Sequence, residues 1–355
     1  MEYRKLKTLA KYPTGKLNSN AAVEDGEYPF FTCAHDIYRI DQYSYDGEYV
    51  LLGGNNASGN FPIFYYNGKF DAYQRTYLIQ PLSEDTDTKY LFYSIGLKLH
   101  QMKANASGTA TKFLTQPILN NINIEYRDID EQKRIADILS AYDNLIENNN
   151  KRIRLLEQMA ENLYKEWFVR FRFPGYEDAE FDNGVPKNWE YSKLINFIDV
   201  RYGKDHKNIE EGTIPILGSG GIMRYGDRAL YNGEAVLIPR KGSLNNIMYI
   251  NGDFWTVDTL FYSIPKIKNI ARYLYFTFKY FDMDSLNSGA SIPSMTTDII
   301  YHLKMRQPDA TVLEMFDEVL KPIYEEMDIL GKQNDSIKNQ RDMLLPRLMS
   351  GKLEV

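Results

Sequence analysis

The sequence repeats itself once, at a period near 185 residues, and this duplication limits the fold more than any other feature. Four short segments recur in the same order, with an offset that drifts from 186 to 181 residues. The pairs are Asp46–Leu52 with Asn232–Ile238, Tyr66–Phe70 with Ile250–Phe254, Tyr90–Tyr93 with Tyr273–Phe276, and Ser107–Thr109 with Ser288–Ala290. One short match arises by chance, but four in order predict two halves with the same fold.

Each half begins with a region rich in Gly, Asn and Tyr, in which short apolar runs alternate with turn residues. These runs predict strands at 49–52, 63–66, 235–238 and 247–250, set between Asn-Gly and other Gly-rich turns. Segments 91–99 and 271–280 predict helices. Each region therefore reads as a mixed α/β module.

A heptad pattern follows each module. Between 128 and 170, and again between 309 and 349, seam positions recur in strict alternation of four and three residues, as in a coiled coil. The first seam holds Ile135, Leu139, Tyr142, Ile146, Asn149, Ile153, Leu156, Ala160, Leu163 and Trp167, and the second holds Phe316, Leu320, Ile323, Met327, Leu330, Asn334, Ile337, Arg341 and Leu344. The fold class is therefore α+β, with two modules joined by two long helices in an antiparallel coiled coil.

The boundaries follow from these patterns. We predict a first module at 1–127, a first spacer helix at 128–172, a second module at 173–308 and a second spacer helix at 309–355. Between Ile135 and Trp167 the first helix is about 50 Å long at 1.5 Å per residue. Pro322 and Gly331 predict a kink in the second helix.

Each seam carries one asparagine near its middle, Asn149 in the first helix and Asn334 in the second. A polar residue at a seam position sets the register of a coiled coil. The alternative is that the seam frays there and the amide meets water. The two amides can meet only if the helices align at their centres.

Charge and composition exclude several classes of protein. The net charge of -6 lies entirely in the two helical segments, which together hold 13 basic and 19 acidic residues. The modules are neutral, which is not the basic footprint of a protein that binds nucleic acid tightly by itself. The single cysteine, Cys33, excludes a disulfide scaffold and suits a reducing cytosol. No apolar run is long enough for a membrane span, and the N-terminus does not resemble a signal peptide.

Two loops at equivalent places carry side chains suited to DNA. Asn and Arg read adenine and guanine edges in the major groove, and Lys contacts phosphates. An ordinary hairpin loop is the alternative, because Asn and Gly are common in turns. The candidate DNA-binding residues of these loops are Asn55, Asn56 and Ser58 in the first module and Arg240, Lys241, Ser243, Asn245 and Asn246 in the second. Lys112 and Ser291, just after the repeated Ser-Gly, are further candidates for phosphate or base contact.

No catalytic motif is present. The sequence contains no phosphate-binding P-loop, dinucleotide fingerprint, nucleophile elbow or Cys-x-x-Cys pair, and its four histidines are far apart. We therefore predict no catalytic residue and no metal ligand. Two other functions remain as alternatives: a coiled-coil adaptor without base readout, and a single-chain DNA-modifying enzyme.

Three segments resemble the specificity subunits of type I restriction-modification systems. Asp130–Ala136 (DEQKRIA) opens the central helix as in that family, Asn162–Phe168 with Phe171–Gly175 resembles the end of the central conserved region, and Leu344–Leu353 resembles the usual tail. The second helix departs from the pattern, because Ala310–Met315 stands where the Glu-Gln opening is expected. The order of module and helix, twice over, is also that of the family.

The resemblance implies a DNA-recognition subunit that is not itself catalytic. Each module would be a target recognition domain for one half of a bipartite site in double-stranded DNA. The helices would act as a spacer that binds two modification (methyltransferase) subunits, joined by restriction subunits. S-adenosylmethionine, ATP and Mg²⁺ would be bound by those partners, so we expect no cofactor in this chain. The implied location is the cytoplasm of a prokaryote, associated with the nucleoid and not with a membrane.

Overall fold

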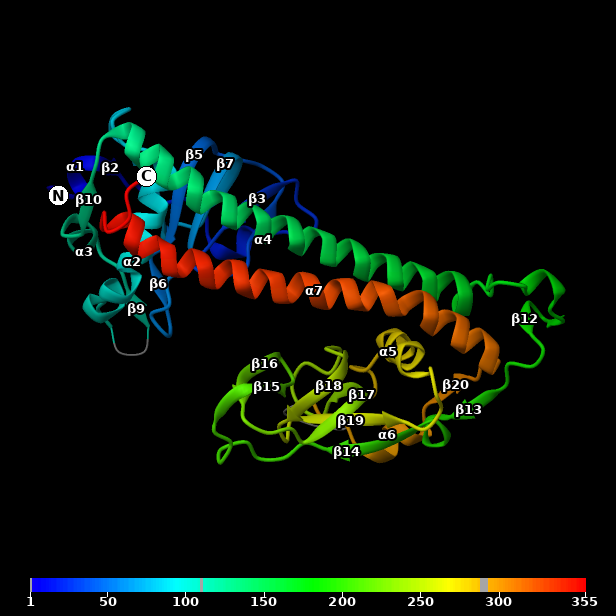
Figure 1. Cartoon of the computed structure of the whole chain (residues 1–355). Helices are drawn as coiled ribbons and strands as arrows, with labels where there is room; N and C mark the ends of the chain where they lie inside the picture. The colour runs from blue at the N-terminus through cyan, green and yellow to red at the C-terminus, as the bar shows by residue number, and fades with distance from the viewer. Residues whose placement is uncertain (1, 109–110, 288–292) are drawn as a thin grey trace. The chain divides into compact units, whose positions relative to one another are not determined.

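The computed structural model describes residues 2–108, 111–287 and 293–355, and it divides into two compact units. The first unit contains residues 1–150 and 331–355, and the second contains residues 151–330. Each unit is one module together with part of both long helices, labelled α4 and α7 in Figure 1. The predicted fold class is confirmed: two mixed α/β modules are combined with two long helices.

The module of the first unit is built on a six-stranded sheet. Its order is β2-β8-β5-β7-β3-β4, and all neighbours are antiparallel except β3 and β7. The strands are β2 (Ala10–Lys11), β3 (Tyr28–Phe31), β4 (Tyr38–Ile40), β5 (Tyr45–Gly53), β7 (Ile63–Ala72) and β8 (Thr76–Pro81).

The second unit repeats this topology strand for strand. Its sheet has the order β14-β19-β17-β18-β15-β16, again with one parallel pair, β15 and β18. The strands are β14 (Ile198–Tyr202), β15 (Glu211–Gly218), β16 (Gly221–Gly226), β17 (Tyr231–Pro239), β18 (Met248–Thr256) and β19 (Leu260–Pro265). The sequence repeat is therefore a duplication of the whole sheet.

The Asn-Gly pairs of the repeat and the equivalent Asp46-Gly47 lie inside strands, so the prediction that the Asn-Gly pairs form turns was wrong. Gly47 pairs with Gly68 across β5 and β7, and Gly233 pairs with Gly252 across β17 and β18. All four glycines have φ between +116° and +141°. A side chain disfavours that conformation. The glycines thus let two long strands continue through a local irregularity that other residues would strain.

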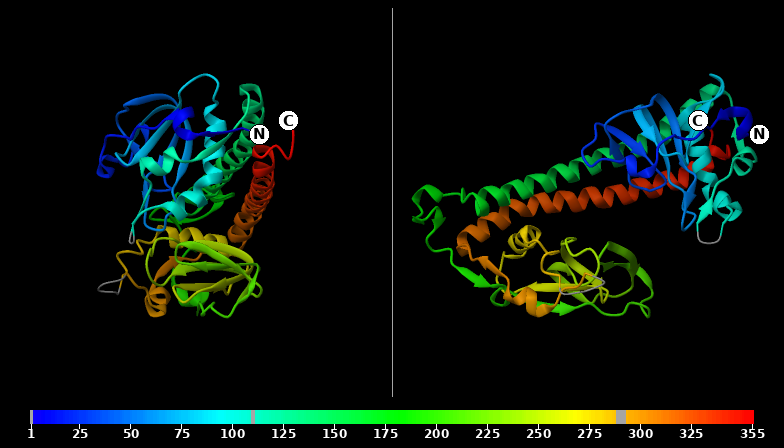
Figure 2. Two further views of the ribbon diagram at one scale, coloured as in Figure 1. Left: turned by 90° about the vertical axis from the view of Figure 1, so that its left-hand side faces the viewer. Right: turned by 180° about the vertical axis from the view of Figure 1, so that it is seen from behind.

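Helices cover one face of each sheet. In the first unit α2 (Thr88–Asn105) packs on β5 and β7, and in the second unit α5 (Ala271–Tyr280) packs on β17 and β18 (Figures 1 and 2). Along β5, Val50 and Leu52 face α2 and the long helices, whereas Leu51 faces a separate aromatic cluster on the other side. This alternation is the period of two that buries both faces of a strand.

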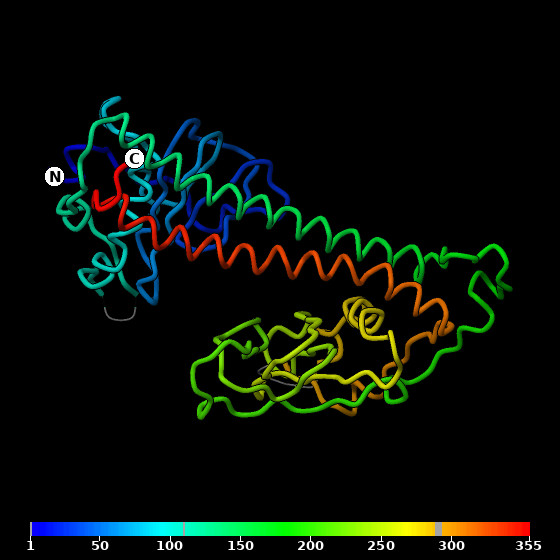
Figure 3. The backbone as a smooth tube through the Cα atoms, viewed as in Figure 1, coloured from blue at the N-terminus to red at the C-terminus, as the bar shows by residue number. Residues whose placement is uncertain are grey.

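The long helices are continuous. The first, α4, runs from Ile129 to Tyr164 and ends in a π-helical turn, Lys165–Val169. It stops short of the predicted residue 172, because Phe171 adopts a φ of +58° that breaks the helix. The second, α7, runs from Ala310 to Met349 as one helix through Pro322 and Gly331. Figure 3 follows the chain of the second unit from the end of α4 (green) to the start of α7 (orange).

Shorter elements complete the two units. Small antiparallel pairs lie outside the two six-stranded sheets, and short helices lie in the connections. The strands are β1 (Glu2–Lys5) with β10 (Asn123–Tyr126), β6 (Asn55–Asn56) with β9 (Lys112–Phe113), β11 (Phe181–Asp182) with β12 (Val185–Pro186), and β13 (Tyr191–Lys193) with β20 (Lys304–Arg306). The helices are α1 (Leu6–Leu9), α3 (Gln116–Asn120) and α6 (Thr297–His302), with 3-10 turns at Ser19–Ala21, Tyr176–Asp178 and Leu194–Asn196.

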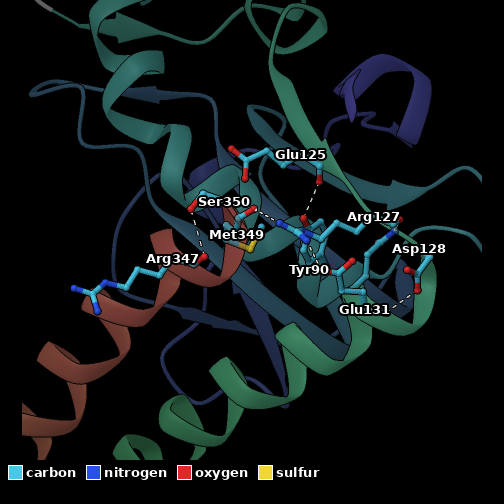
Figure 4. A network of polar contacts seen from close by, with 9 residues as sticks. Tyr90, Glu125, Arg127, Asp128, Glu131, Arg347, Met349 and Ser350 are labelled. Atoms are coloured by element: carbon cyan, nitrogen blue, oxygen red, sulfur yellow. Dashed lines mark hydrogen bonds and ion pairs between the residues drawn. The ribbon is translucent and has the colours of Figure 1, made fainter. Parts of the chain in front are cut away.

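A polar network in the first unit joins the start of α4 to the end of α7 (Figure 4). Arg127 is paired with Glu131 and donates from Nη2 to the carbonyl of Met349 at 3.1 Å. Asp128 accepts from the backbone N–H of Glu131 at 2.9 Å. Two of the segments that resemble the family, the Glu-Gln opening and the C-terminal tail, therefore lie together.

The seam asparagines are hydrogen-bonded to each other in the first unit. Asn149 donates from Nδ2 to Oδ1 of Asn334 at 3.0 Å, and Asn334 donates to Oδ1 of Asn150 at 2.9 Å. Asn149 is 8% exposed. The two helices are therefore antiparallel and aligned where their asparagines meet, as the register hypothesis requires.

Replacing Asn149 alone with Leu is expected to destabilise the first unit by about 1–2 kcal/mol, because it leaves the amide of Asn334 with fewer partners in a closed seam. Replacing both Asn149 and Asn334 with Leu is expected to recover that loss while weakening the definition of register. Urea unfolding of the two variants measures the stabilities. A double variant that is no more stable than the single one contradicts this account.

Candidate nucleic-acid interface

The loop after β5 closes on the segment that precedes α3. The two-residue strands β6 and β9 pair antiparallel, with Asn55 opposite Phe113 and Asn56 opposite Lys112. Four of the predicted site positions therefore gather in one place, since Ser58 follows in the same loop.

The side chain of Asn56 holds this loop in shape. Its Oδ1 accepts hydrogen bonds from the backbone N–H and hydroxyl of Ser58, at 2.9 and 2.7 Å, and from the backbone N–H of Asn60 at 3.2 Å. Such a cap is typical of Asn in turns. Asn55 carries a buried Oδ1 that has no hydrogen-bond partner in the described part of the chain, so an acceptor lies beside the loop.

Two lysines converge on the same loop. Lys103, at the C-terminal end of α2, donates to Oδ1 of Asn60 at 2.8 Å. A Cβ at Gly59 would lie 3.0 Å from Cγ of Lys103 and 3.3 Å from Cγ of Lys112, so both lysine stems pass this glycine. Neither lysine forms an ion pair with a carboxylate of residues 2–108, 111–287 or 293–355. Their charges remain available to an anion.

A third cation lies next to this pair of strands. The guanidinium of Arg75 is 5.4 Å from the ring centre of Phe113 in β9, and its backbone carbonyl accepts from Gly54 at 2.8 Å. Nearby, burial raises the pKa of the Cys33 thiol although the backbone N–H groups of Asn55 and Gly54 oppose the shift. The cysteine is therefore a neutral thiol at the edge of a cationic loop.

The loop after β17 occupies the same place in the second unit. Lys241 pairs with Ser294 in an isolated bridge, as Asn56 pairs with Lys112 in the first unit. Arg240 donates from Nη1 to the carbonyl of Asp258 at 3.1 Å, and its guanidinium lies 5.4 Å from the ring of Tyr202. Lys241 and Ser243 are exposed.

The two asparagines of this loop tie it to its neighbours. Asn245 donates to the carboxylate of Asp284, and Asn246 donates to the carbonyl of Ser219 at 2.7 Å. Leu244 between the flanking polar residues is fully buried and anchors the loop. The amide nitrogens of both asparagines are thus already engaged, while Lys241 and Ser243 face solvent.

The structure adds residues that the sequence did not indicate. Lys103 and Arg75 are 9 and 37 residues from Lys112 along the chain, so only the fold brings them to the loop. Ser294 takes the position opposite Lys241, whereas the predicted Ser291 lies outside the described residues. No local motif marks any of these positions.

Each loop by itself can contact an anion. The two loops present cations, hydroxyls and amides at equivalent edges of two like modules, which is the chemistry of phosphate and base-edge contacts. The described ranges contain no group of three or more His, Cys, Asp or Glu arranged to hold a metal ion. They also contain no helix long and apolar enough to cross a membrane.

The fold and these loops define a class of protein: a duplicated chain of two α/β modules on paired long helices, with a polar, cationic loop at the same place in each module. A model of the family described as type I restriction modification DNA specificity domain matches residues 1–158 and 186–341. The chain belongs to this family.

Individual relatives agree with this assignment. The chain is 31% identical over 215 residues to the specificity subunit of the type I restriction enzyme EcoDI of Escherichia coli, which covers 54% of this chain and 47% of that subunit. It is 26% identical over 302 residues to the MjaVIII specificity subunit of Methanocaldococcus jannaschii, covering 76% and 71% of the two chains. The alignment with the EcoDI subunit thus spans about half of that relative.

A solved structure shares the fold. The S subunit of a type I restriction-modification system from M. genitalium superimposes with a TM-score of 0.64 at 18% identity, over 98% of this chain and 95% of that one. At this level of identity the likeness concerns the fold.

Proposed function

We propose that this chain is the DNA-recognition subunit of a type I restriction-modification complex, and that each module reads one half of a bipartite site in double-stranded DNA. The observation that carries the proposal is the equivalence of the two loops. Lys112 with Lys103 in the first module, and Lys241 in the second, offer cationic side chains at equivalent paired segments, although Lys112 and Lys241 lie on opposite partners of the pair.

We further propose that the long helices are a scaffold for two modification subunits, which restriction subunits join. Large apolar side chains on the outer faces of the helices support this role. They are Ile138 and Leu145 in the first unit, and Leu155 and Met159 in the second, exposed by 37%, 53%, 64% and 56%. Exposed apolar stripes of this kind mark surfaces that a partner covers. The acidic charge of the helices also suits a protein partner better than DNA.

In this proposal the chain performs no chemistry. S-adenosylmethionine, ATP and Mg²⁺ bind to the partner subunits, and the modification subunits methylate adenine N6. The 36 residues of α4 correspond to a rod of about 54 Å at 1.5 Å per residue. That length is about 16 base pairs at 3.4 Å each, so half-sites about one helical turn or slightly more apart, centre to centre, suit the spacer.

The test is the methylome of a host that expresses this chain with its modification subunit. We expect one bipartite motif with N6-methyladenine in both halves. The double change Arg240→Ala and Lys241→Ala is expected to weaken or relax the recognition of one half of the motif and to leave the other half unchanged. It should also lower the salt dependence of DNA binding by about one unit for each phosphate that the variant no longer neutralises. Lys268→Ala, an exposed lysine beyond the other end of β19, is the matched control.

Two outcomes oppose the proposal. An unchanged motif in the double variant removes the loop after β17 from DNA recognition. If the wild-type complex assembles but no motif appears, or if exchange of residues 1–127 for another module leaves the motif unchanged, the chain is an adaptor without base readout. Methyl transfer by the purified chain alone would instead favour a single-chain enzyme.

A further inference from the structure

The first unit contains a cavity of about 580 Å³ between β7, α2 and the two long helices. Its lining combines the aromatic residues Phe64, Tyr65, Tyr66, Phe92 and Tyr93 with the charged residues Lys89, Asp143, Glu147, Arg341 and Asp342. Cavities of this size and mixed lining are typical of binding sites. The DNA-binding loops proposed above do not contribute to it.

The duplication identifies the equivalent place in the second unit. Tyr90 in α2 and Tyr273 in α5 make the same bond, each donating its hydroxyl to a backbone carbonyl at 2.7 Å. Lys89 therefore corresponds to Arg272, one residue earlier in the respective helix. The constant offset of 181 between the two heptad seams makes Ala136 equivalent to Asp317 and Asp143 equivalent to Tyr324.

In the second unit this place is filled by the chain itself. The Arg272 guanidinium forms an ion pair with Asp317 of α7 and lies 3.7 Å from the carboxylate of Glu234. It also lies 5.2 Å from the ring centre of Tyr249 and 5.2 Å from that of Tyr324. The two rings are 5.0 Å apart and nearly perpendicular. An aromatic ring and a carboxylate, two helical turns apart on α7, thus occupy the site.

The first unit keeps the contacts that the sheet residues make in the second unit. Tyr65 donates its hydroxyl to Glu48 just as Tyr249 does to Glu234. The ammonium of Lys89 lies 5.6 Å from the ring centre of Tyr65.

The side chains that fill the second unit, however, have no counterparts here. Ala136 replaces the carboxylate, and Asp143 replaces the ring and is turned away toward the hydroxyl of Tyr93 and toward Arg341. Within the described ranges Lys89 has no carboxylate partner.

A second position also differs in volume. In the second unit Lys279 lies 3.8 Å from Glu161 and covers the ring of Tyr275. Its counterpart in α2 is Gly96, which lines the cavity, and a Cβ built there meets no atom within 4 Å. The cavity therefore results from the replacement of Lys279 and Tyr324 by smaller or redirected side chains.

We propose that this cavity binds an aromatic side chain that a protein partner presents next to a carboxylate. The ring would lie against Tyr65 and the carboxylate against Lys89, as Tyr324 and Asp317 do around Tyr249 and Arg272. We favour a protein side chain because protein side chains fill the equivalent place in the second unit. The inference rests on the proposed function in one respect, since the partner it names is a modification subunit.

Within the described residues this place is open in the first unit and filled by side chains in the second. Two copies of a partner bound to the two halves would therefore differ in this contact. Stacking of the partner's ring on Tyr65 adds to the free energy gained by burying that aromatic side chain.

The chemistry is tested on the full chain with two probes, 4-hydroxyphenylacetate and 4-methylphenol, by ligand-observed NMR. A Kd of about 1 mM is expected for the acid, as befits so small a ligand. Lys89→Met keeps the apolar stem but removes the charge. It should raise the Kd of 4-hydroxyphenylacetate about fivefold to tenfold while leaving the Kd of 4-methylphenol unchanged. Absence of binding by both probes, or equal binding of the acid to both proteins, overturns the proposal.

The partner is tested by assembly with the modification subunit. Gly96→Phe places a ring in the open cavity and should abolish probe binding and weaken assembly at least tenfold. Gly96→Ala is the matched control, because it also removes the helix glycine but adds only a methyl group. If Gly96→Phe blocks binding of the probe but leaves assembly unchanged, the cavity binds a free aromatic acid, and the proposal that a protein partner supplies the aromatic side chain is wrong. Failure of the wild-type chain to assemble at all instead counts against the proposed function.

Discussion

Replacing Arg272 with Met is expected to lower the free energy of unfolding of the second unit by about 3–5 kcal/mol. The Arg272 side chain is 7% exposed, and its ion-pair partner Asp317 is 17% exposed. Burial by itself lowers the pKa of Arg272, but Tyr249, Asp317 and Glu234 together raise it above its ordinary value, so the guanidinium is charged. Its removal leaves a carboxylate in a largely buried place without a counter-charge.

Urea unfolding of the full chain measures this effect, with Arg201→Met as the matched control. Arg201 pairs with Asp199 at 2.6 Å but is 59% exposed, so its loss is expected to leave the stability nearly unchanged. Adding Asp317→Leu to Arg272→Met should recover part of the loss, because the unpaired carboxylate is then gone. A loss below about 1 kcal/mol for Arg272→Met contradicts the argument.

Replacing Gln132 with Ala is expected to destabilise the first unit by about 2–3 kcal/mol. The Gln132 side chain is 1% exposed and makes three hydrogen bonds. Its Nε2 donates to the carbonyls of Asp85 and Arg127 at 2.9 and 2.8 Å, and its Oε1 accepts from the backbone N–H of Asp87 at 2.9 Å. Asp87 in turn caps α2 by accepting from Tyr90 at 2.8 Å, so one amide joins α4 to the start of α2.

Hydrogen exchange gives a local measurement of this contact. The amide of Asp87 should lose protection in Gln132→Ala, whereas Gln101→Ala, an exposed glutamine on α2, should leave it unchanged. Gln132→Leu tests the cause, because Leu313 is the fully packed equivalent in the second unit, 2% exposed. If Gln132→Leu is as stable as the wild type, shape and not hydrogen bonding is what the position requires.

Gln132 also explains a departure within the sequence. The first helix opens with Glu131-Gln132, and the second has Val312-Leu313 instead. In the first unit these residues bind the backbone of a loop and Arg127. In the second unit the same positions lie in the hydrophobic core with Phe316. The first turn of α4 thus contacts its module through hydrogen bonds, whereas the first turn of α7 contacts its module through apolar packing.

The candidate interface was predictable in part. The sequence indicated Asn56 and Lys112 as separate candidates, each next to a repeated segment, and the structure places the two residues opposite one another. The engagement of Asn245 and Asn246 with Asp284 and Ser219 was not predictable. Those partners are 27 to 39 residues away along the chain, and no periodic pattern records them.

The sequence by itself determined the duplication, the heptad helices and the two kinds of region, because each is written as a period along the chain. The prediction from the sequence was wrong where the conformation depends on a neighbouring strand. The Asn-Gly pairs were expected to form turns, but glycine paired with glycine lets β5 and β7 continue as strands. Only the tertiary structure decided in which unit the place next to the long helices is filled by side chains and in which unit it is a cavity. Arg272 and Lys89 are equivalent cations in the repeat, and the side chains that α4 and α7 bring to them make one a buried ion pair and the other the wall of a cavity.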